Sequence, residues 1–191
     1  MSTGKLITRH AFGVSRAKNC LLFKDDHHLL YASGNNVIVY NTETKEQNFI
    51  HASSYPFVGL GVTCISTNKY KNMIAIAEKT SQGYGVVSFF DTHAPYRKKK
   101  YLHYTDVGSK EIICTSFSND GKFFAVQGGA PEWNLSIWNI EKVPKLLCVY
   151  KSCPHEDQQT VSSMSFCPYD HSIIAIFGKS VGKLLKYVEG N

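Results

Sequence analysis

The sequence repeats itself about every fifty residues. Four segments each end in a short run of apolar residues that closes on an aromatic side chain, and three of them continue with Asn or Asp. The closing aromatics are Tyr40, Phe90, Trp138 and Tyr187, which lie 50, 48 and 49 residues apart. Self-similarity at a fixed period of this kind is typical of solenoids and propellers. The period therefore restricts this chain to folds that stack one small structural unit several times.

Each repeat has the pattern strand, turn, strand, loop, strand. In the third repeat, the apolar runs 112–117 and 123–127 flank a turn that contains Asp120-Gly121, and Asp-Gly between two apolar runs is a strong hairpin signal. One further strand is expected after three of the closing strands, at residues 47–52, 99–104 and 145–150. The pattern predicts antiparallel units of up to four strands.

Composition and the closing residues narrow the fold further. The chain has 191 residues, 43% of them hydrophobic and 19% charged, and its 11 Tyr and 11 Phe favour sheets over helices. An aromatic residue followed by Asn or Asp is a degenerate form of the Trp-Asp ending of WD-repeat blades, which recur at about 40–45 residues with four strands each. We predict an all-β fold, a WD40-like β-propeller with about four blade repeats at residues 15–52, 58–104, 110–151 and 158–191.

The predicted ring is incomplete. A propeller has about four to eight blades, and three full blades with a partial fourth leave inter-blade faces open. The fourth repeat has no outer strand before Gly190-Asn191, and residues 5–12, which precede the first blade, are a candidate outer strand for a last blade. We expect residues 1–191 to be the N-terminal part of a longer chain, or to pack against further blades contributed by another chain.

Charge and cysteine usage set broad limits on partners. The net charge of +6 and the pI near 8.9 permit an acidic partner such as nucleic acid, tubulin tails or anionic lipid without selecting one. The six cysteines show neither CxxC pairs nor zinc-site spacing, so we predict small buried hydrophobes and no metal site. The sequence has no apolar leader and no run long enough to span a bilayer, and we expect a soluble, cytosolic protein without a membrane contact.

Motifs for chemistry are weak throughout the chain. Gly178-Lys179-Ser180 resembles the end of a phosphate-binding loop, but that motif requires glycine where Ile173 stands, and the context is a hairpin without a following helix. There is no G-x-S-x-G elbow, and the eight histidines are scattered over turns and outer strands. We therefore predict no catalytic residue, no cofactor and no enzymatic activity, with a propeller hydrolase as the least favoured alternative.

One dense basic run is the main candidate for partner binding. Arg97, Lys98, Lys99 and Lys100 lie between Tyr96 and Tyr101 on a predicted outer strand. Such a run is suited to an acidic partner, such as tubulin tails or nucleic acid phosphates on whose bases tyrosines can stack. The other interpretation, which we favour, is that the lysines protect an exposed edge strand from pairing with other chains.

A second candidate is the tryptophan of a loop in the third repeat. Trp133 follows Gly128-Gly129-Ala130-Pro131-Glu132, a run suited to an irregular loop. Displayed on the surface, it would be an anchor for a partner, because tryptophan is enriched at binding hot spots. Packed inward, it would cover its own loop, and the sequence favours neither interpretation.

Several segments, taken in order, resemble one family. They are Arg9–Val14, Ala32–Asn36, Ile74–Glu78, Arg97–Lys99, Phe117-Ser118 with Lys122, and Gly182–Gly190. Together they resemble the N-terminal end of the cilia- and flagella-associated WD-repeat proteins, and the likeness extends over essentially the whole chain. The resemblance implies two N-terminal propellers followed by a long coiled coil in the full-length protein, located on the cytoskeleton of the ciliary axoneme.

The resemblance also implies a function. It is that of a non-enzymatic adaptor on the doublet microtubule of a motile cilium, which helps to attach or regulate inner-arm dyneins beside the nexin–dynein regulatory complex. The alternative from another class is an RNA- or translation-associated WD-repeat protein that uses the basic strand on nucleic acid, a partner that we do not favour. A heptad segment downstream in the gene would support the first hypothesis, and salt-dependent RNA affinity lost on Lys98→Glu and Lys99→Glu would support the second.

Overall fold

The described residues form four antiparallel sheets. The computed structural model describes residues 4, 9–15, 17–52, 58–103, 109–154 and 159–189. The first sheet contains β1 (Leu21–Phe23), β2 (His28–Ser33), β3 (Asn36–Asn41) and β4 (Gln47–His51), and the second contains β5 (Gly59–Asn68), β6 (Met73–Thr80), β7 (Gly85–Asp91) and β8 (Lys98–His103). The third contains β9 (Ile112–Phe117), β10 (Phe123–Gly128), β11 (Asn134–Asn139) and β12 (Lys145–Lys151), and the fourth contains β13 (Thr160–Phe166), β14 (Ile173–Lys179) and β15 (Val181–Lys186). Within each sheet the strands pair in sequence order, and helix is absent from the described residues.

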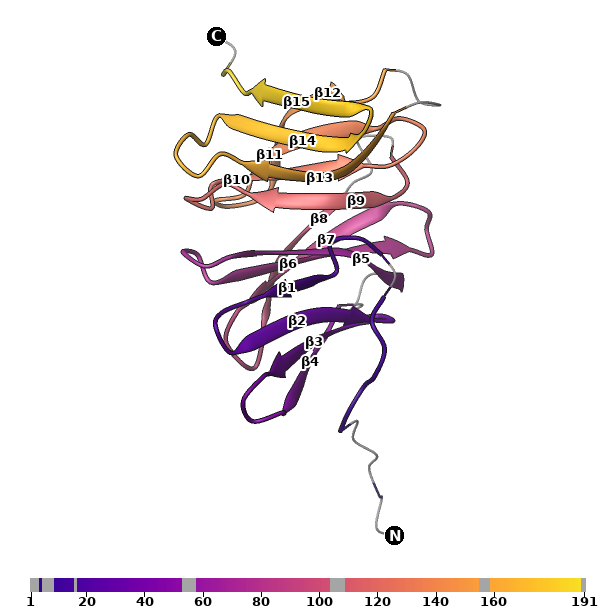
Figure 1. The fold of residues 1–191 in the computed structure, drawn as a ribbon, viewed down its shortest axis with the longest axis vertical. Helices are drawn as coiled ribbons and strands as arrows, with labels where there is room; N and C mark the ends of the chain where they lie inside the picture. Colours follow the sequence, from indigo (N-terminus) through magenta and orange to yellow (C-terminus); the bar gives the residue numbers. More distant parts are fainter. Residues whose placement is uncertain are drawn as a thin grey trace.

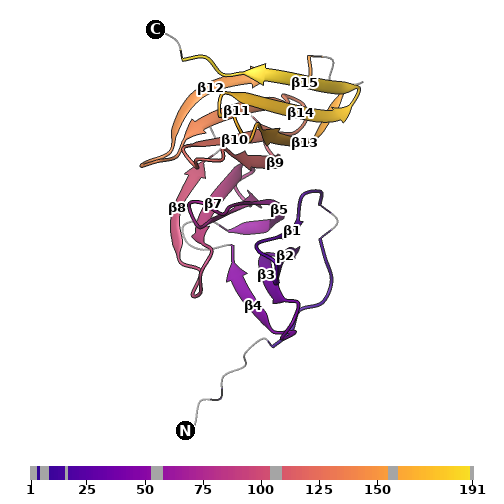
Figure 2. The same cartoon turned by 60° about the vertical axis from the view of Figure 1, so that its left-hand side comes forward.

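The sheets stack as the blades of an open propeller. They follow one another along the molecule in sequence order (Figure 1), and the rotated view shows them fanning out in an arc (Figure 2). The first strands of neighbouring sheets touch, since β9 contacts both β5 and β13, so these strands line the inner side of the arc. In the part of the chain that the structure describes, the fourth blade does not close on the first. This arrangement confirms the predicted all-β fold and its incomplete ring.

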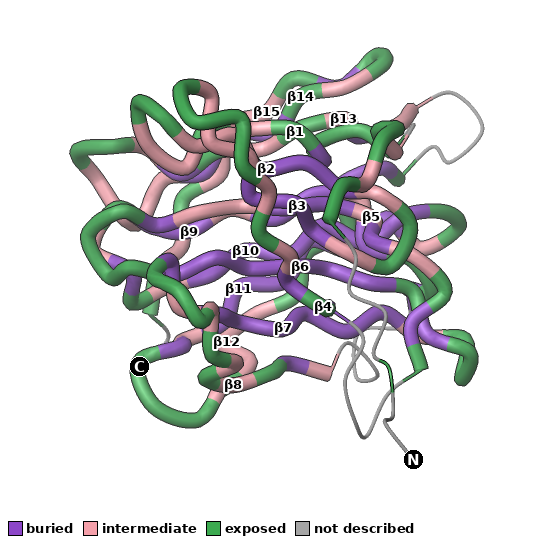
Figure 3. The backbone as a smooth tube through the Cα atoms, turned by 90° about the horizontal axis from the view of Figure 1, so that it is seen from below, coloured by how far each residue is buried: buried purple, intermediate pink, exposed green. Residues whose placement is uncertain are grey.

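The apolar core consists of three layers, each between two adjacent blades. The layer between the second and third blades holds an aromatic cluster, in which the Phe124 ring lies 5.0 Å from that of Phe89 and 4.7 Å from that of Phe117. Corresponding layers lie between the first and second blades and between the third and fourth. Buried backbone concentrates where the sheets face each other, as Figure 3 shows. Strands β6, β7, β10 and β11 are buried along nearly their whole length because each lies in a blade with a neighbour on both sides.

Strand register corrects the sequence-based alignment of the fourth repeat. Two residues after each of Tyr40, Phe90 and Trp138, a backbone N–H donates a hydrogen bond to the turn that precedes the second strand of the same blade. The donors are Thr42, Thr92 and Ile140. In the fourth blade the residue that donates this bond, to Ser172 O at 2.7 Å, is Tyr187 itself. The position equivalent to Trp138 is therefore Leu185, which pairs with Ile174 as Trp138 pairs with Phe124. The prediction that Tyr187 closes the fourth repeat was wrong, because a residue in the following turn happens to be aromatic.

The Asn or Asp after the closing aromatic has a local structural role. The side-chain oxygens of Asn41, Asp91 and Asn139 accept hydrogen bonds from backbone N–H groups two residues later, at 2.8, 3.0 and 3.0 Å. Such Asx turns favour a tight change of direction. They start the connection to the outer strand in the three blades that have one, whereas the fourth blade has Lys186 at this position.

The two ends of the arc differ. Of the candidate outer strand at residues 5–12, positions 5–8 lie outside the described residues, and positions 9–12 form no strand. Instead, Ala11 bonds to the Gln47 side chain through its N–H at 2.8 Å and accepts a bond from the Tyr31 hydroxyl at 3.2 Å. This segment thus lies over the outer face of the first blade, where Ile38 is fully buried. On the outer face of the fourth blade, Phe177 is 54% exposed and Leu184 is 77% exposed.

Candidate interaction surface

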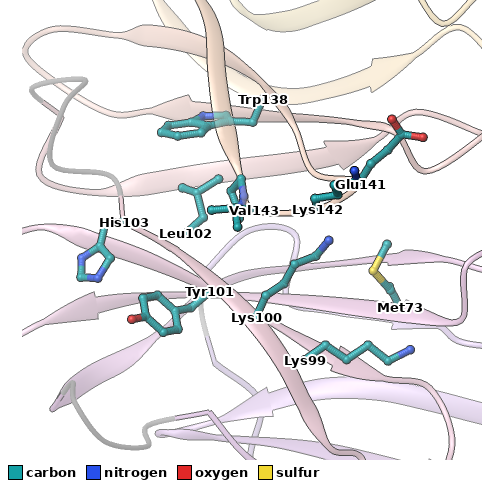
Figure 4. A pocket seen from close by; sticks show the side chains of 11 residues that line it. Met73, Lys99, Lys100, Tyr101, Leu102, His103, Trp138, Glu141, Lys142 and Val143 are labelled. Atoms are coloured by element: carbon teal, nitrogen blue, oxygen red, sulfur yellow. The ribbon is translucent and has the colours of Figure 1, made fainter.

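A groove lies at the outer rim between the second and third blades. It has a volume of about 740 Å³ and is bounded by β8 on one side and by the turn between β11 and β12 on the other. Leu102, Met73 and Trp138 give it an apolar floor, and ionisable side chains stand around it (Figure 4). They are Lys99, Lys100, His103, Glu141 and Lys142. We call this the rim groove.

A β-bulge divides the basic run. Lys100 pairs with Phe89 and Lys98 with Phe90, which leaves Lys99 as the extra residue on β8. Residues that pair across antiparallel strands project from the same face of the sheet. Phe89 faces the third blade and Phe90 faces the first, so the bulge turns Lys100 and Lys98 toward opposite sides of their blade.

The contacts of the three lysines agree with this division. Lys100 donates a hydrogen bond to Ile140 O in the third blade, and its ammonium lies 5.8 Å from the centre of the Phe89 ring. Lys98 lies on the other side, 5.6 Å from the Tyr101 ring centre. Lys99 forms an ion pair with Asp91 at 2.9 Å. The run is therefore not one continuous cationic face.

Protonation in this region follows from these contacts. The backbone N–H of His93 and the ammonium of Lys99 hold the pKa of Asp91 well below its usual range. Burial lowers the pKa of Lys98 and of Lys100, and the neighbouring Lys99 charge lowers the latter further. Asp91 thus stays ionised and neutralises part of the charge of the run.

The predicted residues occupy different environments. Lys99 and Lys100 line the rim groove, Lys98 lies on the other side of its blade, and Arg97 is exposed just before β8 and is not among the lining residues. Trp133 is only 6% exposed and packs in the layer between the third and fourth blades with Leu135. This placement agrees with the interpretation in which the indole covers its own loop, and a partner contact through Trp133 stays a prediction that requires the indole to leave this layer.

Sequence reasoning missed half of the groove. Glu141, Lys142, Val143 and Pro144 form its second wall, and no motif marks them. The available signal was their position, since they follow Trp138-Asn139 directly and the Asx turn at Asn139 directs them toward the rim. Alignment of residues 139–144 with residues 41–46 of the first repeat locates this turn. It does not locate the groove, because the other wall of the groove comes from the neighbouring blade.

The ionisable side chains of the rim groove are spread along it. His103 and Glu141 lie at opposite ends of the groove in Figure 4. Within the described residues, no group of three or more His, Cys, Asp or Glu side chains is placed to hold a metal ion. The same part of the chain contains no helix long and apolar enough to cross a membrane.

Four of the six cysteines fit the prediction of small buried hydrophobes, whereas Cys148 and Cys167 are partly exposed. Cys20, Cys64, Cys114 and Cys153 are buried, and all six cysteines are free thiols. Burial raises the pKa of Cys20 to about 11 and that of Cys114 to about 12. Because the thiolate is the reactive form, these thiols are poor nucleophiles near neutral pH.

Comparison with known proteins shows that the chain is similar to part of several cilia- and flagella-associated proteins. No known family profile matches it. The chain is 30% identical over 191 residues to cilia- and flagella-associated protein 57 of Mus musculus, an alignment that covers all of this chain and 15% of that protein. It is 27% identical over 143 residues to cilia- and flagella-associated protein 44 of Mus musculus, covering 74% of this chain and 7% of that protein. The chain thus spans 15% or less of the length of these two relatives.

Solved structures show the same fold at low sequence identity. A chain in the crystal structure of the mitotic checkpoint complex matches with a TM-score of 0.66 and 16% identity, over 90% of this chain and 50% of that one. The β-propeller domain of Cps50 (Swd1) from Myceliophteria thermophila matches with a TM-score of 0.66 and 11% identity, over 88% of this chain and 52% of that one. The four blades therefore correspond to about half of such a chain.

Proposed function

We propose, from its sequence similarity to cilia- and flagella-associated proteins, that this chain is a non-enzymatic scaffold of the ciliary axoneme. The observation that carries this proposal is the 30% identity to the mouse protein along all 191 residues. An arc of rigid blades suits the role, since each inter-blade rim offers a fixed surface for a different partner. The cytoskeleton of the cilium or flagellum is the location that follows.

Imaging the endogenous protein with a small tag tests the location. We expect signal along motile cilia that persists after detergent removes the membrane, because a scaffold stays bound to the axoneme. A cytosolic marker expressed in the same cells should be lost on extraction. Absence of the tagged protein from cilia contradicts the proposal, as does its persistence in an organism without motile cilia.

At finer detail, we propose that the scaffold helps to attach or regulate inner-arm dyneins beside the nexin–dynein regulatory complex. This assignment derives from the family resemblance and concerns a protein of which this chain is similar to a small part. Quantitative mass spectrometry of axonemes from cells lacking the protein should show selective loss of inner-arm dynein subunits. Outer-arm subunits are the internal control, and equal abundance of both classes with and without the protein counts against the assignment.

Within this scaffold, we propose the rim groove as the contact for an acidic partner such as tubulin tails. Lys99, Lys100 and Lys142 around an apolar floor support it, because long-range attraction raises the association rate of an acidic segment. Lys142→Glu should weaken co-sedimentation with microtubules, and Lys179→Glu on the fourth blade is the matched charge control. Equal loss in both variants would indicate a net-charge effect instead of a groove contact.

The division of the basic run disfavours the RNA-associated alternative. A strand of nucleic acid is bound along a groove whose charges and aromatic rings follow one path. Here Lys98 and Lys100 lie on opposite sides of the blade, and Lys99 is paired with Asp91. RNA binding that depends steeply on salt and is lost in Lys98→Glu would overturn this argument.

A further inference from the structure

The rim groove has a structural counterpart between the first and second blades. There, Ile50 on β4 corresponds to Leu102 on β8, since each pairs with the residue three positions before the closing aromatic of its blade. Phe90 corresponds to Trp138, because each is the closing aromatic of the blade that follows and packs in the layer between the two blades. The two junctions therefore have equivalent apolar residues beneath the rim.

Between the first and second blades, the chain supplies an aromatic side chain of its own. Tyr96 lies in the turn between β7 and β8, is half-buried and packs against the apolar layer that contains Ile50 and Phe90. Burial raises the pKa of the Tyr96 hydroxyl, and the nearby charge of Asp25 in the first blade raises it further. Both observations place the phenol ring between the two blades.

The turn that bounds the rim groove supplies no such ring. Residues 140–144, between β11 and β12, include no aromatic residue. Val143 of this turn, which lines the groove (Figure 4), is 83% exposed. The space above Met73, Leu102 and Trp138 is a groove of about 740 Å³. An aromatic ring from elsewhere fits this groove, because a ring of the chain's own packs at the equivalent place one blade earlier.

Charge selects the sequence that carries such a ring. Three lysines line the rim groove against a single glutamate. Lys99 is paired with Asp91, Lys142 is exposed on the turn, and Lys100 reaches the third blade from β8. Acidic residues beside the ring are attracted to this site, whereas a second copy of this chain, with a net charge of +6, is repelled.

The rim groove lies away from both ends of the arc. The second and third blades, which form its two walls, each have four strands. Further strands or blades that extend the ring therefore add elsewhere. The occupant of this groove is not a missing part of a blade.

From this comparison, we propose that the rim groove binds an acidic segment of a partner protein through one anchoring aromatic side chain, which packs over the groove floor as Tyr96 packs at the neighbouring junction. Acidic residues on either side of the anchor lie near Lys100 and Lys142. The proposal rests on the rim groove as the contact for an acidic partner and adds what that partner must carry. A segment of glutamate alone gains the charge attraction but not the burial of a ring.

Two fluorescent peptides separate the anchor from the charge. Each has nine residues, glutamate and glycine in alternation with tyrosine or alanine at the centre, and anisotropy measures binding to the 191-residue chain. The tyrosine peptide should bind about tenfold more tightly than the alanine peptide, because the ring buries apolar area in the groove. Equal affinity of the two peptides overturns the anchor alone and leaves the acidic contact in place, whereas binding of neither peptide overturns both.

The two tryptophans of the chain locate the bound peptide. Trp138 lines the rim groove, and Trp133 packs in the layer between the third and fourth blades, so Trp133 is the internal control. In NMR spectra, the tyrosine peptide should shift the indole N–H resonance of Trp138 through the ring current of the anchor and leave that of Trp133 unchanged. A shift at Trp133 alone overturns the proposal.

A pair of variants tests the groove wall. Val143→Glu should weaken binding of the tyrosine peptide by about tenfold, because it places a like charge beside the acidic segment. Val143→Gln is the matched control, with the same shape and no charge, and both variants should fold because Val143 is exposed. Equal binding of the two variants contradicts the proposal. So does a longer product of the same gene in which the Trp138 shift is present without peptide, because the occupant is then a segment of the protein itself.

Discussion

Within the described residues, the junction between the second and third blades is closed, whereas the fourth blade is uncovered on its outer face and along the edge of β15. At the closed junction, Phe89 and Phe124 are fully buried and Leu102 on the outer strand β8 seals the layer from the rim. On the fourth blade, the inner face is packed against the third blade, but Phe177 and Leu184 on the other face are largely exposed. The first three strands of each blade form the same antiparallel meander in both regions.

This difference shows which parts of a blade depend on neighbours. Strand pairing and turns form within one blade, and they are as regular in the fourth blade as in the third. Burial of side chains requires the adjacent blade, because each blade is only one sheet thick. The energy that holds the arc together is therefore concentrated in the layers between blades.

The largest expected contrast is between two phenylalanines. Phe124→Ala removes a fully buried ring from the aromatic cluster and should lower the free energy of unfolding by about 3–5 kcal/mol. The matched Phe177→Ala on the open face should cost about 1 kcal/mol or less, because little buried area is lost. Urea unfolding of both variants measures the contrast. Equal losses would show that the outer face of the fourth blade is covered in solution.

A smaller effect is expected from two glycines that allow close approach. A Cβ at Gly178 would lie 1.7 Å from the backbone oxygen of Thr160 on β13, so Gly178→Ala forces two paired strands apart. A Cβ at Gly85 would meet only the Ile112 side chain across the closed junction, at 2.7 Å. We expect Gly178→Ala to cost about 1–3 kcal/mol, and more than Gly85→Ala, because a side chain can rotate and a paired backbone cannot.

Hydrogen exchange locates the damage from these two variants. Faster exchange in Gly178→Ala should be confined to β13 and β14, since the clash lies within the fourth blade. A greater loss of stability in Gly85→Ala than in Gly178→Ala would contradict this expectation. It would mean that the junction between the second and third blades tolerates an added methyl group less well than the strand pairing inside the fourth blade does. The close approach of Gly178 to β13 also gives the glycine of Gly178-Lys179-Ser180 a role in strand packing.

Much of the fold was predictable because it is local. The apolar runs, the Asp120-Gly121 turn and the outer strands near residues 47, 99 and 145 all match observed elements. The alignment of Tyr187 failed because register depends on pairing with β14, and periodicity alone cannot distinguish a strand end from the turn after it. Similarly, no sequence pattern announced the bulge that separates Lys98 from Lys100.

The surface was less predictable for a physical reason. Each groove is formed by two blades, so its second wall comes from residues about forty positions away along the chain. The sequence identified Lys99 and Lys100 as a basic cluster, but whether a lysine reaches solvent or the next blade depends on packing. Trp133 illustrates the same limit, because its loop sequence is equally compatible with display and with burial.

A modest contrast is expected within the basic run. Lys100→Met should lower the free energy of unfolding by about 0.5–1.5 kcal/mol, because it removes the hydrogen bond to Ile140 O across the closed junction while keeping the apolar stem. Lys99→Met breaks an ion pair near the surface with Asp91 and should cost about 0–1 kcal/mol. Thermal unfolding at low and high salt separates the two. The Lys99 effect should shrink with salt, and a larger loss in Lys99→Met than in Lys100→Met would contradict the assigned contacts.

The smallest expected effect compares one turn in the two blades. Burial raises the pKa of Asp120, but hydrogen bonds from the Ser118 hydroxyl and the Lys122 N–H outweigh it and leave the pKa below its usual value. The Ser172 hydroxyl and N–H lower the pKa of Asp170 in the same way. A carboxyl whose pKa is lowered by folding stabilises the protein above its unfolded pKa of about 3.9, and this contribution is lost as the pH falls through the folded pKa.

Carboxyl titration by NMR should therefore show both groups protonating below about pH 3.9. Asp120→Asn and Asp170→Asn should each flatten the decline of stability between about pH 5 and pH 3, because the hydrogen bonds that lower the two pKa values are donated within each turn. His171 of the fourth blade, 3.9 Å from Asp120, lowers the pKa of Asp120 further, so Asp120→Asn should have the larger effect. A normal pKa at Asp170 with a lowered one at Asp120 would show that the open blade has lost its turn as well as its cover. The fourth blade would then differ from the third in the conformation of its backbone as well as in the exposure of its outer face.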